Sequence, residues 1–147
     1  MTAQVFVDSN VLIYASDPRD LRKMKASTHW LRSLWNRKNA AVSPQILNEY
    51  YNVSTRLAPG LDKAVARRDL RRFQQWHVVM PDQEFYELAF AVQDRFRFSW
   101  WDCLIVAAAK RGGCTHLLTE DLQHGQDLGG LSVVSPFRIA PEAVLAG

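Results

Sequence analysis

The sequence lacks the features that mark membrane, secreted and nucleotide-cofactor proteins. No apolar run is long enough to span a bilayer, and the first residues lack the basic, apolar and small-residue order of a signal peptide. The two cysteines, Cys103 and Cys114, match no zinc or redox motif. Neither GxxxxGK[ST] nor GxGxxG occurs, so nothing supports a nucleotide-cofactor site. These absences favour a cytoplasmic protein with two buried, reduced thiols.

The composition is that of a globular protein with a mildly basic surface. The 147 residues suit one domain, with 48% hydrophobic and 22% charged residues and a net charge of +3. Basic residues gather in two stretches, 19–38 and 63–72. They either bind nucleic-acid phosphates or form the solvated faces of helices. The candidates for RNA binding are Arg19, Arg22, Lys23, Lys25, Arg67 and Arg68.

Short apolar stretches alternate with amphipathic ones along the chain. The apolar stretches predict strands at 5–7, 40–42, 77–80, 116–119 and 131–134. Asp17 followed by Pro18 predicts the start of a helix that runs to about residue 38. Further helices are expected from 44 to about 57, from Asp62 to about 76, from 82 to about 97 and from 99 to 111. The alternation indicates an α/β fold with a mostly parallel sheet, and the tail after 136 has little pattern.

Four acids fall at positions that such a sheet brings to one edge. Asp8 and Asp121 come directly after strands, and Glu49 lies in the second turn of the helix after the second strand. Asp102 lies in the first turn of the helix that leads into the strand before Asp121. Ligands bind outside the carboxyl ends of parallel strands, so these acids can meet there. Each also has an ordinary alternative as a turn acceptor, solvated helix acid, capping-box acid or loop acid.

Acids gathered in this way favour a divalent cation. Two like charges about 4 Å apart repel by about 4 kcal/mol at an effective dielectric constant near 20. Oxygen ligands suit Mg²⁺ or Mn²⁺, which can activate a water and stabilise charge on a phosphate. Asn10 and Thr119 could assist by orienting ligands or water, and Glu120 or Asp127 could substitute for a member of the set. A metal site in a basic chain is what a phosphodiester-cleaving enzyme needs.

Four blocks of the sequence resemble the PIN-domain ribonucleases. They are VDSNVLIYA at 7–15, SPQILNE at 43–49, SWWD at 99–102 with its alanine-rich continuation, and LLTED at 117–121. Their order and spacing are similar to those of the virulence-associated protein C (VapC) type of toxin, as far as Pro136. The family's acids fall on Asp8, Glu49, Asp102 and Asp121. Ser9 stands where the family often has threonine.

The resemblance implies a single domain over 1–147 with a three-layer α/β/α fold around a five-stranded, mostly parallel sheet. It also implies a Mg²⁺- or Mn²⁺-dependent endoribonuclease that acts as a toxin. The implied partners are RNA, a second copy of the chain and a small antitoxin that inserts into the acidic groove.

We therefore expect RNA hydrolysis by a metal-activated water. One alternative is a haloacid-dehalogenase-like phosphatase with Asp8 as nucleophile, although that family places a second acid where Asn10 stands. The other is a non-catalytic module that binds RNA or a partner.

Overall fold

The computed structural model describes residues 4–57 and 60–145, which form an α/β fold around a parallel sheet. The strands are β1 (Val5–Val7), β2 (Ala40–Val42), β3 (His77–Val78), β4 (His116–Leu118) and β5 (Ser132–Val134). Their order in the sheet is β3-β2-β1-β4-β5, and every neighbouring pair is parallel. The predicted five-stranded sheet is confirmed, and β1 is its central strand.

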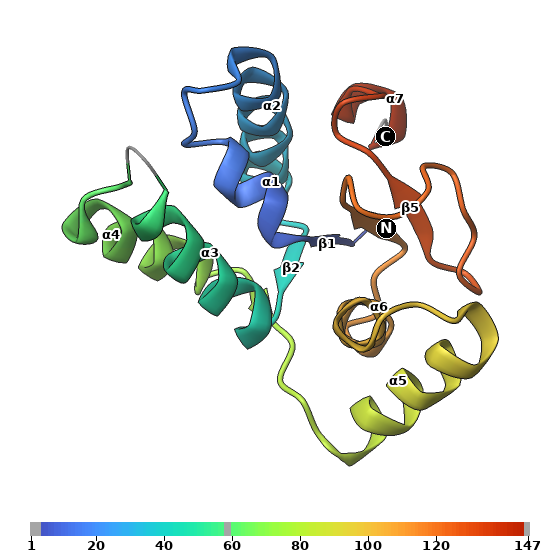
Figure 1. Cartoon of the computed structure of the whole chain (residues 1–147). Coiled ribbons are helices and arrows are strands. Elements are labelled where there is room, and N and C mark those ends of the chain that lie inside the picture. Colours follow the sequence, from blue (N-terminus) through green and yellow to red (C-terminus); the bar gives the residue numbers. More distant parts are fainter. Residues whose placement is uncertain (1–3, 58–59, 146–147) are drawn as a thin grey trace.

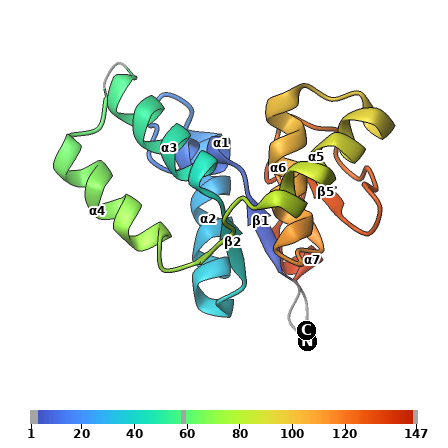
Figure 2. The ribbon, with the colours of Figure 1, turned by 90° about the horizontal axis from the view of Figure 1, so that it is seen from below.

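Helices cover both faces of this sheet. They are α1 (Ser9–Tyr14), α2 (Leu21–Arg37), α3 (Pro44–Arg56), α4 (Lys63–Phe73), α5 (Gln83–Phe96), α6 (Trp100–Arg111) and α7 (Pro141–Val144). Figure 1 shows the course of the chain, and Figure 2 shows α1 to α4 on one side of β1 and β2, with α5 and α6 on the other. The fold is therefore the expected three-layer α/β/α arrangement. No helix within the described ranges is long and apolar enough to cross a membrane.

The core explains why β1 is apolar on both faces. Val5, Phe6 and Val7 are each 0% exposed, because helices pack on both sides of the central strand. The same layers bury Leu117 of β4 and Leu34 of α2. A strand so enclosed holds the residue at its carboxyl end, Asp8, in a fixed place.

The predicted start of α2 is wrong by three residues. The helix begins at Leu21, and its N-cap is Asp20, whose Oδ1 accepts a hydrogen bond from the Lys23 backbone N–H at 3.0 Å. Asp17 instead accepts from Arg19, through the backbone N–H at 3.1 Å and the guanidinium at 2.8 Å and 2.9 Å. A carboxylate used by this local turn does not cap the helix.

Other boundaries also differ from the expected ones. α4 ends at Phe73, about three residues early, and β4 and β5 are each one residue shorter than expected. β3 ends at Val78, two residues early, although the Val79 N–H still donates to the Val42 carbonyl at 2.8 Å. The tail contains α7, which packs near α2, and the Trp30 indole N–H donates to the Ile139 carbonyl at 3.0 Å. This contact ties a segment without a sequence pattern to the body of the fold.

Candidate active site

Asp8 is both the N-cap of α1 and the most buried acid of the site. Its backbone is extended, and its N–H donates to the Leu118 carbonyl at 3.0 Å, which continues the pairing of β1 with β4. Oδ1 accepts from the Ser9 N–H at 2.7 Å, and Oδ2 accepts from the Thr119 hydroxyl at 2.7 Å. Only 3% of Asp8 is exposed. Capping and a place in a site are therefore compatible at this residue.

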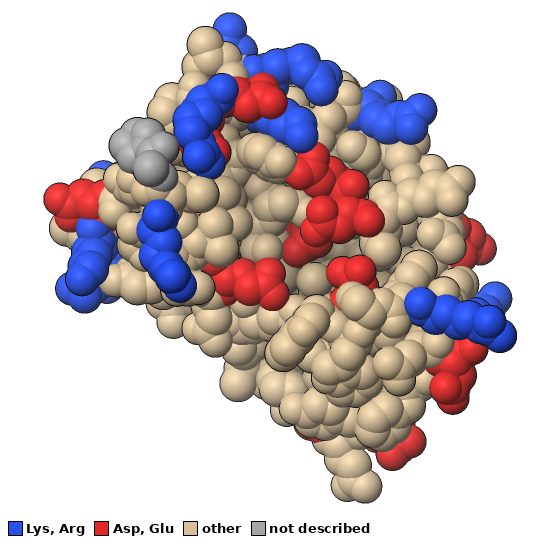
Figure 3. Space-filling view, viewed as in Figure 1, with Lys and Arg blue, Asp and Glu red and all other residues tan. Residues whose placement is uncertain are grey.

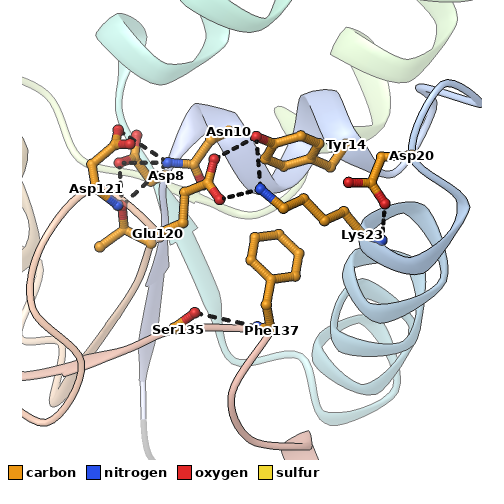
Figure 4. A network of polar contacts seen from close by, with 10 residues as sticks. Asp8, Asn10, Tyr14, Asp20, Lys23, Glu120, Asp121, Ser135 and Phe137 are labelled. Atoms are coloured by element: carbon orange, nitrogen blue, oxygen red, sulfur yellow. Dashed lines mark hydrogen bonds and ion pairs between the residues drawn. The ribbon is translucent and has the colours of Figure 1, made fainter.

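Asn10 and Thr119 join Asp8 to Asp121, and Figure 4 shows Asn10 beside both carboxylates. The Asn10 amide nitrogen lies 3.4 Å from Asp8 Oδ2, 3.2 Å from Thr119 Oγ1 and 3.1 Å from Asp121 Oδ2. Thr119 is fully buried, and its Oγ1 also accepts from the Asp121 N–H at 3.1 Å. Asn10 Oδ1 is buried without a hydrogen-bond partner among the described residues. The two residues expected to assist thus hold two of the acids.

Glu49 reaches Asp8 through Ser9. The Ser9 hydroxyl donates to Glu49 Oε2 at 2.7 Å and lies 3.4 Å from Asp8 Oδ1. The Gln45 amide donates to the other oxygen, Oε1, at 2.9 Å. Glu49 therefore points towards Asp8 rather than into bulk solvent. Ser9 and Gln45 were not expected as contacts, and the hydroxyl directly after Asp8 was the available signal for Ser9.

Asp102 belongs to the group by charge rather than by a direct bond. It lies in the first turn of α6, where its N–H donates to the N-cap hydroxyl of Ser99 at 3.2 Å, which is one of the two bonds of a capping box. Within the described residues, its carboxylate forms no hydrogen bond with Asp8, Glu49 or Asp121. Its negative charge is nevertheless among those that raise the pKa of Asp121, so the two carboxylates are near enough to interact.

The acids perturb one another's ionisation. Burial raises the pKa of Asp8 to about 6; the hydrogen bonds from Thr119 and Ser9 oppose this rise, and the charges of Asp121 and Glu49 add to it. Burial also raises the pKa of Asp121, as do the charges of Glu120, Asp102 and Glu49. Figure 3 shows acidic side chains around a hollow at the centre of one face, with basic side chains at its rim. We call Asp8, Glu49, Asp102 and Asp121 the acid cluster.

The acid cluster fits a hard divalent cation by its chemistry. Its donors are all oxygens, and the buried Asn10 Oδ1 adds an acceptor without a partner. Across residues 4–57 and 60–145, no three His, Cys, Asp or Glu side chains converge into a complete metal-binding group. Mg²⁺ is commonly held by one or two carboxylates and several waters, so an incomplete protein shell suits it. Such a cation would offset the repulsion among the carboxylates, which adds to burial in raising the pKa values of Asp8 and Asp121.

Asp127 and Glu120, the two possible substitutes for a member of the acid cluster, form their hydrogen bonds outside it. Asp127 Oδ1 accepts from the N–H groups of Gly129 and Gly130 at 3.1 Å and 2.9 Å, which stabilises the loop before β5. Glu120 binds Lys23, with 2.9 Å between Nζ and Oε2, and also accepts from the Tyr14 hydroxyl. Neither carboxylate is turned towards the acid cluster by its hydrogen bonds.

The six basic candidates divide into two groups. Arg19 pairs with Asp17 at 2.8 Å, Lys23 with Glu120 at 2.9 Å, and Arg68 with Asp69 at 3.4 Å. The others form no ion pair within the described residues: they are the exposed Arg22 and Lys25 on α2 and the exposed Arg67 on α4. Arg67 also donates to the Tyr51 hydroxyl at 3.1 Å. Of these six, Lys23 contacts the residue next to Asp121.

Solved structures with the same fold include toxin–antitoxin proteins. A toxin–antitoxin complex from Klebsiella pneumoniae contains a chain that is 18% identical, with a TM-score of 0.69 over 92% of this chain and 100% of the other. A chain in the structure of FitAB bound to a DNA fragment is 18% identical, with a TM-score of 0.71 over 92% of this chain and 97% of the other. VapC20 of Mycobacterium tuberculosis, a toxin that cleaves the sarcin–ricin loop, is 21% identical, with a TM-score of 0.57 over 78% of this chain and 87% of the other.

A search among proteins of curated function found no match. The model of one protein family, the PIN domain, matches residues 5–126 and so includes every member of the acid cluster. Because this match covers most of the sequence, the chain belongs to the PIN domain family.

Proposed function

We propose that this protein is a Mg²⁺- or Mn²⁺-dependent endoribonuclease that acts as the toxin of a toxin–antitoxin pair. The observation that carries the proposal is the contact of one amide, that of Asn10, with the carboxylates of both Asp8 and Asp121 at the carboxyl edge of the sheet. Membership of the PIN domain family and the raised pKa values of these two acids support the same conclusion.

In this proposal, the acid cluster holds the cation and neighbouring residues hold the acid cluster. Asp8, Glu49, Asp102 and Asp121 would hold the cation, directly or through water. The cation supplies a water of lowered pKa and stabilises charge on the phosphate. Thr119 and Ser9 fix the two Asp8 oxygens through hydrogen bonds of 2.7 Å each. Burial of Asp8 and Thr119 excludes bulk water from this end of the site.

The basic residues of α2 and α4 would bind the RNA backbone. Without the acid cluster, the remaining chain carries 18 basic and 11 acidic residues, a surplus that attracts a polyanion. Exposed Arg22, Lys25 and Arg67 are available for phosphates, whereas Arg19, Lys23 and Arg68 would have to leave or share an acidic partner. Phosphate contacts of this kind give affinity that falls as salt rises.

The test is RNA cleavage with Mg²⁺ by the wild type and by Asp8→Asn, with circular dichroism to establish that both are folded. We expect the wild type to cleave and Asp8→Asn to lose at least about a hundredfold in rate, because the cation loses a central ligand. Asp94→Asn, at an exposed acid of α5 outside the acid cluster, is the matched control and should cleave like the wild type.

Two results would contradict the proposal. Equal cleavage by wild type and Asp8→Asn would remove Asp8 from the site. Mn²⁺ binding without cleavage of any RNA would favour a non-catalytic module, and a phospho-aspartate trapped on Asp8 would favour the phosphatase alternative.

We further propose that the chain forms a homodimer and binds a small antitoxin. Large apolar side chains are exposed on α5 and around it, including Met80 at 63%, Tyr86 at 46%, Phe90 at 47% and Trp101 at 66%. Exposed apolar surface of this kind is typical of protein contacts. Light scattering should give a dimer mass, and co-expression with the neighbouring small open reading frame should suppress RNA cleavage. A monomer that this reading frame leaves active would contradict both parts.

A further inference from the structure

Three residues from distant parts of the chain meet beside the acid cluster. Tyr14 ends α1, Lys23 lies in the first turns of α2, and Glu120 directly precedes Asp121 (Figure 4). Lys23 Nζ lies 2.9 Å from Glu120 Oε2 and 3.3 Å from the Tyr14 hydroxyl, which itself donates to Glu120 Oε1. We call these three residues the clamp. Both oxygens of Glu120 are occupied within it.

The clamp is a built structure rather than a chance surface contact. The ammonium of Lys23 lies 4.7 Å from the centre of the Tyr14 ring and 5.0 Å from that of Phe137. These two rings meet edge to face, with 5.4 Å between their centres. About a quarter of each charged side chain is exposed, 25% for Lys23 and 24% for Glu120. A pair enclosed in this way is held more firmly than an ordinary surface ion pair.

The charge of Glu120 reaches the acid cluster although its oxygens do not. Glu120 directly precedes Asp121 in the chain, so its charge lies close to the Asp121 carboxylate. Glu120 is thus a fifth acid at the same edge of the sheet, and Lys23 is the cation that accompanies it. The two charges have opposite effects on a cation bound by Asp121.

We propose that the clamp sets the affinity of the acid cluster for its divalent cation, by turning Glu120 away from the cation and balancing its charge with Lys23. The inference rests on the proposed function, because it assumes that the acid cluster binds Mg²⁺ or Mn²⁺. Lys23, Tyr14 and Glu120 are positioning residues in this account, and none of them is a ligand. Removal of the Lys23 charge and removal of the Glu120 charge should change the affinity for the cation in opposite directions.

The expected changes follow from the charges that remain. Lys23→Met leaves Glu120 unbalanced and free to turn towards Asp121, so Mn²⁺ should bind about five- to tenfold more tightly. Glu120→Gln leaves the Lys23 ammonium unbalanced near the acid cluster, so Mn²⁺ should bind about five- to tenfold more weakly. The double variant Lys23→Met/Glu120→Gln restores the balance and should lie within about twofold of the wild type.

The experiment is calorimetric titration of the full chain with MnCl₂, with thermal unfolding of each metal-free variant as a second readout. Lys38→Met is the matched control: it removes the same charge from an exposed residue just after α2, at the end away from the clamp, and should leave the affinity unchanged. If Lys23→Met does not fold, Lys23→Gln removes the charge while it keeps a donor for Glu120.

A merely structural clamp gives a different pattern. Its loss would weaken Mn²⁺ binding in both single variants and at least as much in the double variant, and that result would overturn the inference. Unchanged affinity in both single variants would overturn it as well. Failure of the wild type to bind Mn²⁺ would overturn the proposed function along with it, whereas normal wild-type binding with the wrong pattern in the variants overturns the clamp alone.

Discussion

Replacement of Asp8 by asparagine should stabilise the metal-free protein while it removes cleavage. The folded protein raises the pKa of Asp8 from 3.8 to about 6, mainly because the carboxyl is buried. A group with a raised pKa in the folded state stabilises the fold fully below its unfolded value and loses this contribution as the pH rises through the folded value. The ionised carboxylate of Asp8 therefore costs stability above about pH 6.

The shift converts to a free energy. About two pKa units at about 1.4 kcal/mol each give about 3 kcal/mol. Asparagine carries no charge, so the stability of Asp8→Asn relative to wild type should rise by about 3 kcal/mol from well below pH 3.8 to pH 8, and most of the rise should fall between pH 4 and pH 8. Weaker hydrogen bonds from Thr119 and Ser9 to a neutral amide offset part of the gain at every pH. In a domain of this size the change corresponds to roughly 6–12 °C in melting temperature.

The assay is urea or thermal unfolding in the presence of a chelator, at intervals from pH 4 to pH 8. Asp94→Asn, at an exposed acid of α5, serves as the control. Addition of Mn²⁺ at about pH 8 should stabilise the wild type by about 2.7 kcal/mol at a hundredfold excess over its Kd, and Asp8→Asn much less. A stability difference that stays constant from pH 4 to pH 8 would refute the electrostatic account of Asp8.

Three further perturbations test other parts of the site. Thr119→Val keeps the buried shape but removes the hydroxyl that donates to Asp8, so the metal-free protein should lose about 1–3 kcal/mol in urea unfolding; an unchanged midpoint would contradict the role of this bond. Ser9→Ala removes the bond to Glu49 Oε2 and should reduce the cleavage rate about tenfold, whereas Ser9→Thr should retain the rate; equal rates for alanine and threonine would show that the hydroxyl is dispensable. Arg67→Gln should weaken RNA binding equally for different sequences and reduce the slope of log K against log salt by about 0.7 for single strands, as read by fluorescence anisotropy; an unchanged slope would exclude Arg67 from phosphate contact.

Helix starts show where local sequence was sufficient and where it was not. Ser43–Pro44 and Asp62 precede α3 and α4 as predicted. Asp62 caps α4 by accepting from the Ala64 N–H at 2.7 Å, whereas the Ser43 side chain makes no capping hydrogen bond and Pro44 at the first helical position marks the start of α3. Asp17–Pro18 carries the same signal, yet α2 starts after Asp20. Asp17 is used by the backbone and guanidinium of Arg19, a local competition that a capping pattern does not reveal.

The clamp shows what pairing across long separations adds. Lys23 was expected to be one of several cations for RNA, and Glu120 a possible substitute in the acid cluster. In the structure they contact each other across 97 residues, with Tyr14 as a third member, so each is bound within the clamp. Sequence spacing cannot reveal such a pair, because α2 and the end of β4 are brought together only by the packing of α1 and α2 against the sheet.

The sequence by itself determined the order of strands and helices and the acids that follow them. Hydrophobic periodicity and capping depend on neighbouring residues in the sequence. The residue that follows a buried strand such as Val5–Val7 can therefore be read from the sequence alone. Only the tertiary structure decided which oxygens meet: that Ser9 joins Glu49 to Asp8, that Asn10 joins Asp8 to Asp121, and that Lys23 holds Glu120 aside. These contacts depend on the sheet order β3-β2-β1-β4-β5, which brings residues some 40 to 110 positions apart to the two sides of one strand.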